Sequence, residues 1–350
     1  MNLYTMYILF VYSNKTDPCT IKSCFDLSRG LKKYAHTYEI DYRELNDEVV
    51  SAYDVIIFQR LGANGIVIEN LYAQRMFHLI TTYHHQKRFI YMIDDLVFED
   101  QNQLPKKLMS ACHAVICPND NLANEAKPYN IHTYVLRTYI DMKQTVKIKG
   151  ANDHIGYDMA WVSTGALGKA FIKEIMDHLR QDMDIRMIAI SGDVRYFSGI
   201  KGIASYPFLP YDDMIAIVKN VNILLNPVII NDRFVTPRIE ERSKKSAKEF
   251  FDCKSEIKYA IAGGTKTAII TSKTAPYLYA IKHMENGFLV DNRVEDWVKA
   301  IKQLYHHKRL RRRIIRNAHK DVKKRYTLEY GAKKAYALFR DILSQPIQSP

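Results

Sequence analysis

The chain has 350 residues, is 47% hydrophobic and 25% charged, and carries a formal net charge of +13 at pH 7. This is the composition of a globular protein, and the length is sufficient for two ordinary domains. No segment approaches the ~18 uncharged apolar residues of a membrane span, and the opening MNLYTMYILFVYSNK lacks the basic leader and cleavage site of a signal peptide, which favours a cytoplasmic protein.

The first half of the chain alternates short apolar runs with helical patterns. Near-continuous apolar runs lie at 7–12, 54–59, 88–93 and 113–118, as expected for strands that are covered on both faces. Between them, 21–35 and 68–85 carry apolar residues at the spacing of amphipathic helices. Strands that alternate with helices predict an α/β fold with a parallel sheet and right-handed crossovers.

The same pattern restarts after a polar stretch at 141–154. Apolar runs at 159–164, 185–191 and 221–227 predict strands, with helices near 167–181 and 211–220 between them. The stretch KSEIKYAIAGGTKTAIITS, 254–272, then reads as a short helix, a glycine turn and a β-branched strand, and 287–290 predicts one more short strand. From about 293 the pattern is purely helical. We therefore predict two α/β domains joined near 142–153.

The five cysteines, Cys19, Cys24, Cys112, Cys117 and Cys253, form an odd and scattered set. They lack the paired spacing of a zinc site, so free thiols in a reducing cytoplasm are expected.

The positive charge is concentrated in the second half. Residues 151–350 hold 34 Lys and Arg against 22 Asp and Glu, and 302–325 hold 11 Lys and Arg with Asp321 as the single acid. Such a segment suggests an anionic partner, either a membrane surface or nucleic acid. A solvated helix face is the alternative.

Candidate site residues follow the expected strands, because ligands of open parallel sheets bind beyond the carboxyl ends of the strands. Arg60 follows 54–59, Asp94 and Asp95 follow 88–93, and Gly192 follows 185–191. The two carboxylates are candidates for holding a hydroxylated acceptor and taking its proton. Capping of the next helix, or pairing with Arg60, is an equal alternative.

The segment STGALGK, 163–169, combines a strand end, a small-residue turn and a helix start. Thr164, Gly165 and Lys169 would offer backbone N–H groups, a helix N-terminus and a charge to a phosphate. The glycine spacing differs from that of a P-loop. A glycine turn that serves only packing explains the segment equally well.

Residues 254–301 resemble the donor-binding segment of nucleotide-sugar glycosyltransferases with the two-domain GT-B fold, specifically the family-4 type that builds bacterial surface polysaccharides. The resemblance rests on the KSEIK helix, the glycine pair, the strand that ends at Ser272 and the NGFLV motif at 286–290. Weaker similarity covers 53–60, 90–98, 113–123 and 206–214.

The resemblance implies two Rossmann-like domains that face each other across a cleft. They would comprise an acceptor domain at 1–148 and a donor domain at 149–325, with a helix at 326–345 returning toward the first domain and a tail at 346–350. It also implies a donor held by the second domain, here assigned to Lys254, Ser255, Glu256, Lys258, Gly263 and Gly264 together with Thr164, Gly165, Lys169 and Gly192.

One departure concerns the pair of glutamates that the family carries seven residues apart. The aligned positions are Cys253 and Ile261. Glu256 lies five residues before Ile261 and is rotated by roughly 140° around a helix, so it does not replace the second glutamate. Lys254 and Lys258 are expected to meet the diphosphate; two surface lysines beside a buried Ile261 are the alternative.

We therefore expect a glycosyltransferase that transfers a sugar, with retention, to a saccharide or lipid-linked acceptor. The co-substrate would be a nucleotide-sugar of the UDP, GDP or dTDP type, with no permanently bound cofactor and no essential metal. The catalytic candidates are Arg60, Asp94 and Asp95. Two alternatives stay open: a phage-type enzyme that glycosylates hydroxymethylated bases in DNA, and a non-catalytic partner subunit of the same fold.

Overall fold

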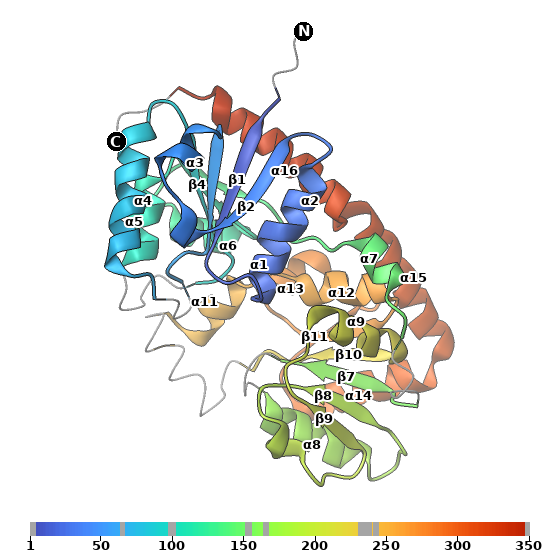
Figure 1. Ribbon diagram of the computed structural model, residues 1–350. Helices are drawn as coiled ribbons and strands as arrows, with labels where there is room; N and C mark the ends of the chain where they lie inside the picture. Colours follow the sequence, from blue (N-terminus) through green and yellow to red (C-terminus); the bar gives the residue numbers. More distant parts are fainter. Residues whose placement is uncertain are drawn as a thin grey trace.

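The computed structural model describes residues 5–63, 67–96, 103–150, 156–163, 168–229, 240 and 245–346 (Figure 1). Two parallel sheets of six strands, each flanked by helices, confirm the α/β architecture expected from the sequence. Thr164 and Gly165 lie outside the described residues.

The first sheet has the strand order β2-β1-β3-β4-β5-β6. Its strands are β1 (Tyr7–Tyr12), β2 (His36–Asp41), β3 (Val55–Gln59), β4 (Arg88–Met92), β5 (Ala114–Cys117) and β6 (Thr133–Val135). The helices between them are α1 (Pro18–Thr20), the π-helix η1 (Ile21–Asp26), α2 (Leu27–Leu31), the 3-10 helix η2 (Tyr42–Glu44), α3 (Asp47–Ser51), α4 (Asn70–Tyr83), α5 (Leu104–Ala111) and α6 (Asp120–Ala126).

The second sheet has the order β12-β11-β10-β7-β8-β9. Its strands are β7 (Met159–Val162), β8 (Met187–Ile190), β9 (Ile203–Tyr206), β10 (Ile223–Asn226), β11 (Ala268–Ser272) and β12 (Phe288–Val290). The remaining helices are α7 (Met142–Lys147), α8 (Lys169–Leu179), the 3-10 helix η4 (Val194–Phe197), α9 (Tyr211–Asn220), α11 (Ala247–Asp252), α12 (Ile257–Thr265), α13 (Ala275–Ala280), α14 (Val294–His306), α15 (Lys308–Arg325) and α16 (Leu328–Ser344).

Successive side chains of the central strands enter cores on opposite faces of each sheet. In β1, Leu9 belongs to a cluster with residues of α4 and α5, whereas Ile8 and Phe10 belong to a cluster with residues of α2 and α16. All these side chains are fully buried. A strand that is buried on both faces loses its alternation of polar and apolar residues, which explains the near-continuous apolar runs of the sequence.

The chain passes from one sheet to the other near residue 140 and returns near residue 327, and the two crossings lie side by side. The Ile140 amide donates to the Tyr326 carbonyl at 2.8 Å, and the Leu328 amide donates to the Ile140 carbonyl at 2.8 Å. Beyond this point α16 packs against α2 of the first sheet (Figure 1). The helix α16 therefore packs on the first sheet.

One segment of the second half also packs against the first sheet. Phe250 of α11 and Cys253 contact the hydrophobic core on the α4–α5 face of that sheet. The Asn119 side-chain amide, at the start of α6, donates to the Cys253 and Lys254 carbonyls, both at 2.8 Å. This contact fixes the entry to α12 relative to the strand ends of the first domain.

The glycine pair of KSEIKYAIAGGTKTAIITS does not form the turn that the sequence predicted. Gly263 and Gly264 lie inside α12, so the predicted glycine turn is wrong and their N–H groups lie within a helix. A Cβ on Gly263 would lie 2.4 Å from Cγ2 of Val322 and 3.0 Å from the Ala318 carbonyl oxygen, both in α15. The glycines therefore permit close packing of α12, and the chain leaves the helix at Lys266 in a left-handed conformation.

We predict that Gly263→Ala lowers the free energy of unfolding by about 1–2 kcal/mol. Overpacking against α15 outweighs the gain of up to about 1 kcal/mol in helix propensity. Denaturant unfolding of the wild type, Gly263→Ala, Val322→Ala and the double variant measures the coupling, because Val322→Ala removes the nearer of the two clashing groups. Strictly additive effects of the two substitutions would contradict this packing role.

Candidate functional site

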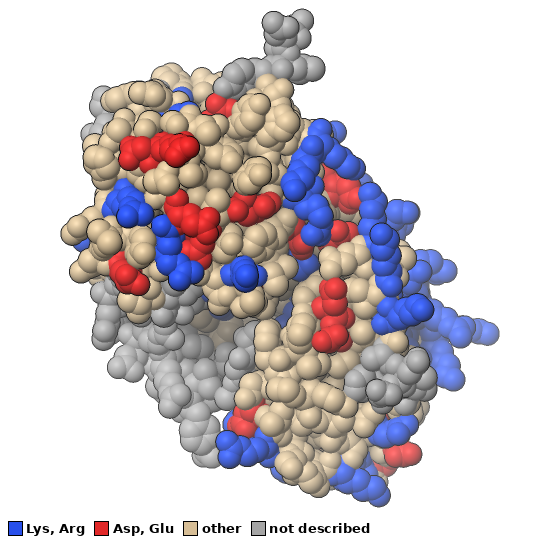
Figure 2. Space-filling view, in the orientation of Figure 1, with Lys and Arg blue, Asp and Glu red and all other residues tan. Residues whose placement is uncertain are grey.

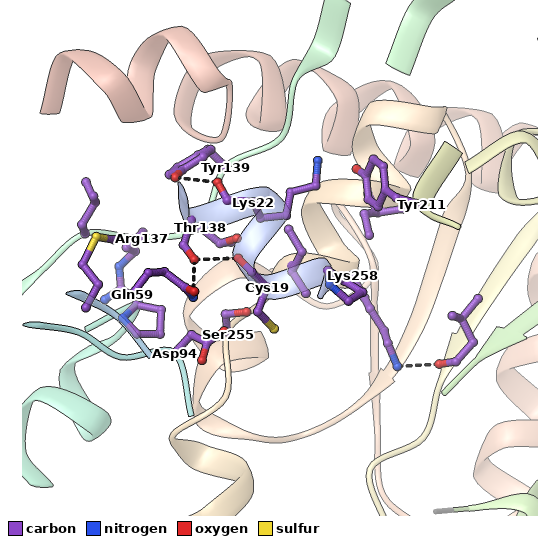
Figure 3. Close-up of a pocket in the computed structure, with 18 of the residues that line it drawn as sticks. Cys19, Lys22, Gln59, Asp94, Arg137, Thr138, Tyr139, Tyr211, Ser255 and Lys258 are labelled. Atoms are coloured by element: carbon purple, nitrogen blue, oxygen red, sulfur yellow. Dashed lines mark hydrogen bonds between the residues drawn. The ribbon is translucent and has the colours of Figure 1, made fainter. Parts of the chain in front are cut away.

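A cavity of about 280 Å³ lies between the two domains (Figure 3), and we call it the interdomain cavity. Its first-domain wall is formed by the carboxyl ends of β3, β4 and β5 and by the segments that follow β1 and β6, and its second-domain wall by the end of β7 and parts of α9 and α12. The polar and charged side chains in its lining are Cys19, Lys22, Ser23, Gln59, Asp94, Arg137, Thr138, Tyr139, Tyr211, Ser255 and Lys258. Most of the remaining wall is apolar.

Lys258 is the cation that α12 places at this cavity. Its amine donates to the Val162 carbonyl at 2.6 Å and to the Asn226 Oδ1 at 2.9 Å, at the ends of β7 and β10. The Asn226 amide in turn donates to Thr271 Oγ1 at 2.8 Å, which fixes its orientation. Burial, with a smaller effect of the nearby Lys254 charge, lowers the pKa of Lys258 to about 8. An anion in the cavity would compensate this poorly solvated charge.

Arg60 and Asp94 form an ion pair at the carboxyl ends of β3 and β4. Their Nη1 and Oδ2 atoms are 3.1 Å apart, and Arg60 is 5% exposed. Burial raises the pKa of Asp94, while the Arg60 guanidinium opposes the shift. A raised pKa suits a proton acceptor. Arg60 has a φ of 53°, a left-handed conformation that costs a non-glycine residue about 1–3 kcal/mol and is frequent at functional sites.

Two further charged candidates, Asp95 and Lys254, meet across the domain boundary. Lys254 forms an ion pair with Asp95, and its amine also lies 4.3 Å from the Phe250 ring centroid. Asp95 thus makes a contact between the two domains. Neither residue lines the interdomain cavity.

The neighbouring Ser255 and Glu256 have different positions. Ser255 lines the interdomain cavity, whereas Glu256 is fully buried behind it as the first residue before α12. Burial raises the pKa of Glu256, and Arg137 opposes this shift. Ile261 lines the cavity at the position where the family carries a glutamate.

Lys169 and Gly192 lie away from this cavity. Lys169 begins α8 after Gly168, and its amine pairs with Asp193 at 2.6 Å. Gly192 is exposed in the loop after β8. Of the phosphate-binding turn expected at 163–169, the structure describes Ser163, Gly168 and Lys169. The charge of Lys169 is already paired with the Asp193 carboxylate.

The segment after β1 supplies site residues that the sequence did not single out. The Lys22 amine lies 3.6 Å from the ring centroid of Tyr211 in the second domain. The Gln59 amide donates to Ser23 Oγ at 2.9 Å (Figure 3). Its Oε1 accepts from Thr20 Oγ1 at 2.9 Å. The rule that ligands bind after parallel strands applies to β1 as well, and it would have pointed to 13–23.

The exposed Lys and Arg side chains of α15 and α16 gather along one edge of the molecule (Figure 2). In α15 the exposed cations are Lys308, Arg309, Arg312, Arg313, Arg316, Lys320, Lys323 and Lys324. Ile314, Ala318 and Val322 form the buried stripe of the same helix. Gly263 meets this stripe from the α12 side, whereas Lys258 and Ile261 of α12 line the interdomain cavity. The basic edge is therefore separated from the cavity by α12.

No helix in the described ranges is long and apolar enough to cross a membrane. Nor do three or more His, Cys, Asp or Glu side chains gather there in an arrangement that could hold a metal ion.

Residues 262–321 match the family model described as glycosyl transferases group 1, whereas no curated protein matches the sequence. HepE from Anabaena, solved with UDP and glucose, is 11% identical with a TM-score of 0.67, covering 96% of this chain and 100% of its own. A glycosyltransferase from Rickettsia africae ESF-5 is 10% identical with a TM-score of 0.67, covering 98% and 100%. An alpha-glucosyltransferase, solved with UDP-glucose and DNA containing an abasic site, is 11% identical with a TM-score of 0.69, covering 97% and 100%.

At these identities the solved structures establish the fold, which is that of the GT-B glycosyltransferases. Together with the family match in the second domain, they support a glycosyltransferase.

We predict that the stability of the protein depends on pH through Lys258. Its folded-state pKa of about 8 lies below the ordinary value of about 10.4, so the unfolded state binds this proton more tightly between these two values. The unfolding free energy should therefore rise from pH 8 to pH 10, by about 1–2 kcal/mol because the side chain borders the cavity. Unfolding of the wild type and Lys258→Met at both pH values measures the difference, and an equal pH dependence of the two proteins would contradict it.

Proposed function

We propose that the chain transfers a sugar from a nucleotide-sugar donor, whose diphosphate binds at Lys258 and the N-terminus of α12, to an acceptor held by the first domain. The observation that carries this proposal is the position of the Lys258 amine beside the interdomain cavity, where two acceptors hold it. Burial there lowers the pKa of Lys258. The diphosphate of UDP, GDP or dTDP would compensate the positive charge of the Lys258 amine. Lys254 and Ser255 lie at the entry to the same helix.

In the reaction, the bond between the anomeric carbon and the diphosphate oxygen breaks, and the acceptor oxygen forms the new bond. Negative charge develops on the departing diphosphate, and Lys258 and the partial positive charge at the start of α12 stabilise it. In this proposal Asp94 takes the proton of the acceptor hydroxyl; its ion pair with Arg60 supports this role. Closure of both domains excludes water and suppresses hydrolysis of the donor.

The acceptor that fits this geometry better is a saccharide or lipid-linked saccharide. The apolar part of the cavity wall suits an acceptor with a hydrocarbon portion. The basic edge of α15 lies behind α12, where it would hold the enzyme against an anionic membrane rather than present an acceptor. A retaining outcome, no essential metal and a role in surface-polysaccharide synthesis follow from the family resemblance and remain parts of the proposal.

DNA is the second candidate acceptor, because an alpha-glucosyltransferase of the same fold was solved with UDP-glucose and DNA and the second half of this chain is basic. Incubation with labelled nucleotide-sugar separates the candidates. Label in lipid extracts and none in hydroxymethylated DNA is the expected result; the reverse result would replace the acceptor class proposed here.

We predict that UDP binding is coupled to proton uptake near pH 8. The diphosphate raises the pKa of Lys258, so the binding enthalpy should depend on the ionisation enthalpy of the buffer. Lys258→Met should abolish this dependence and weaken binding by about tenfold or more, which corresponds to about 1.4 kcal/mol. Lys266→Gln, an exposed lysine at the other end of α12, is the matched control and should bind like the wild type.

The donor is identified first, by a thermal-shift screen against UDP-, GDP-, dTDP- and CMP-sugars, because a ligand raises stability according to its affinity. GDP or dTDP replaces UDP in the calorimetry if it is the better ligand. If all four fail to stabilise the protein and none is hydrolysed, the enzyme is ruled out in favour of a non-catalytic subunit of this fold.

A further inference from the structure

A second cavity, of about 300 Å³, lies where the two chain crossings meet, and we call it the hinge cavity. Its walls come from both domains: α6 and the end of β6 from the first, the C-terminal end of α13 from the second, and the joint between α15 and α16. Its lining residues are Asp120, Val135, Leu136, Arg137, Thr138, Tyr279, Arg325, Tyr326, Tyr330, Gly331 and Lys334. Residues 136–138 separate it from the interdomain cavity, since they line both.

The charged lining of the hinge cavity consists of three cations and one carboxylate. The guanidinium groups of Arg137 and Arg325 both lie over the ring of Tyr279, at 3.6 Å and 5.7 Å from its centroid. Arg137 pairs with Asp120 of α6. Lys334 lies over the Tyr330 ring at 5.7 Å. Cations held by aromatic rings are oriented before a ligand arrives, which lowers the entropic cost of binding.

Arg325 is also held by a carboxylate of its own helix, α15. Its Nε and Nη2 atoms donate to Asp321 at 2.7 Å and 2.6 Å. Of the three guanidinium nitrogens, only Nη1 takes no part in this bidentate pair. The tyrosine hydroxyls of the lining add neutral donors.

We propose that the hinge cavity binds a small soluble anion that carries one or two phosphate groups. Arginine and lysine at the wall of a concave polar site, with tyrosines beside them, form the donor set that recognises phosphate oxygens. The volume lies at the lower end of the range of ligand pockets, roughly 300–1,000 Å³. This fits pyrophosphate or a small phosphorylated metabolite better than a polymer.

An anion in this cavity would act on the hinge. It would contact α6 of the first domain, α13 of the second, and the α15–α16 joint at which Ile140 pairs with Tyr326 and Leu328. Arg325 also connects to α12, because Asp321 accepts from the Tyr259 hydroxyl at 2.8 Å. Tyr259 directly follows Lys258 in α12. A ligand that contacts all these elements favours the domain orientation in which they converge.

Pyrophosphate titrations of the full chain by calorimetry test the proposal, in the Lys258→Met background so that binding in the interdomain cavity is weakened and the hinge cavity is the tighter site. We expect saturable binding that Lys334→Gln weakens by about fivefold to twentyfold. Lys333→Gln is the matched control, because Lys333 is the adjacent exposed lysine of α16 and does not line the cavity. Both substitutions lie on an exposed helix surface and should leave the unfolding midpoint unchanged.

A second variant, Arg137→Gln, removes the cation that the segment between the two sheets contributes to the hinge cavity. It should weaken pyrophosphate binding as Lys334→Gln does. Absence of saturable binding in the Lys258→Met protein would overturn the proposal. So would an equal loss of affinity with Lys333→Gln, which would mean that pyrophosphate binds the basic edge in general. These outcomes do not depend on glycosyl transfer, because the readout is binding alone.

Discussion

Two backbone hydrogen bonds at Ile140 join the outward and the return crossing of the chain between its sheets. Because both crossings are held at one place, they help to set the position of one sheet relative to the other. The strand ends of the first sheet and the start of α12 lie opposite each other across the interdomain cavity. Every site residue described above depends on that arrangement.

The contacts across the domain boundary differ in kind. Near the crossings they are backbone hydrogen bonds and tight packing, such as that of Gly264 against Ile140. Farther away they are side-chain contacts: the ion pair of Asp95 with Lys254, the two hydrogen bonds of Asn119, Lys22 against Tyr211, and the packing of Phe250 and Cys253 on the core of the first sheet. Side-chain contacts at a partly solvated boundary are individually weak, of the order of 1 kcal/mol. The boundary can therefore open to admit a ligand while the crossings remain intact.

The sequence predicted the parts of the fold whose pattern is local. Strands buried on both faces, such as β1 and β3, stand out as apolar runs, whereas the edge strands β2, β6 and β9 were missed because they are only partly buried. The sequence suggested that Lys258 faces a ligand, but it could not show that Val162 and Asn226 hold its amine. It misread the glycine pair, because a glycine that admits a neighbouring helix and one that forms a turn look alike until α15 is in place.

The packing of α16 has a consequence for the order in which the protein is made. Ala332, Ala335 and Phe339 belong to the same hydrophobic cluster as Ile8 and Phe10 of β1. The part of this face that α16 covers thus stays exposed until α16 has been synthesised, while the second domain, inserted between, already has its own core. During synthesis the nascent first domain would expose this apolar face, and a chain shortened before α16 would keep it exposed permanently.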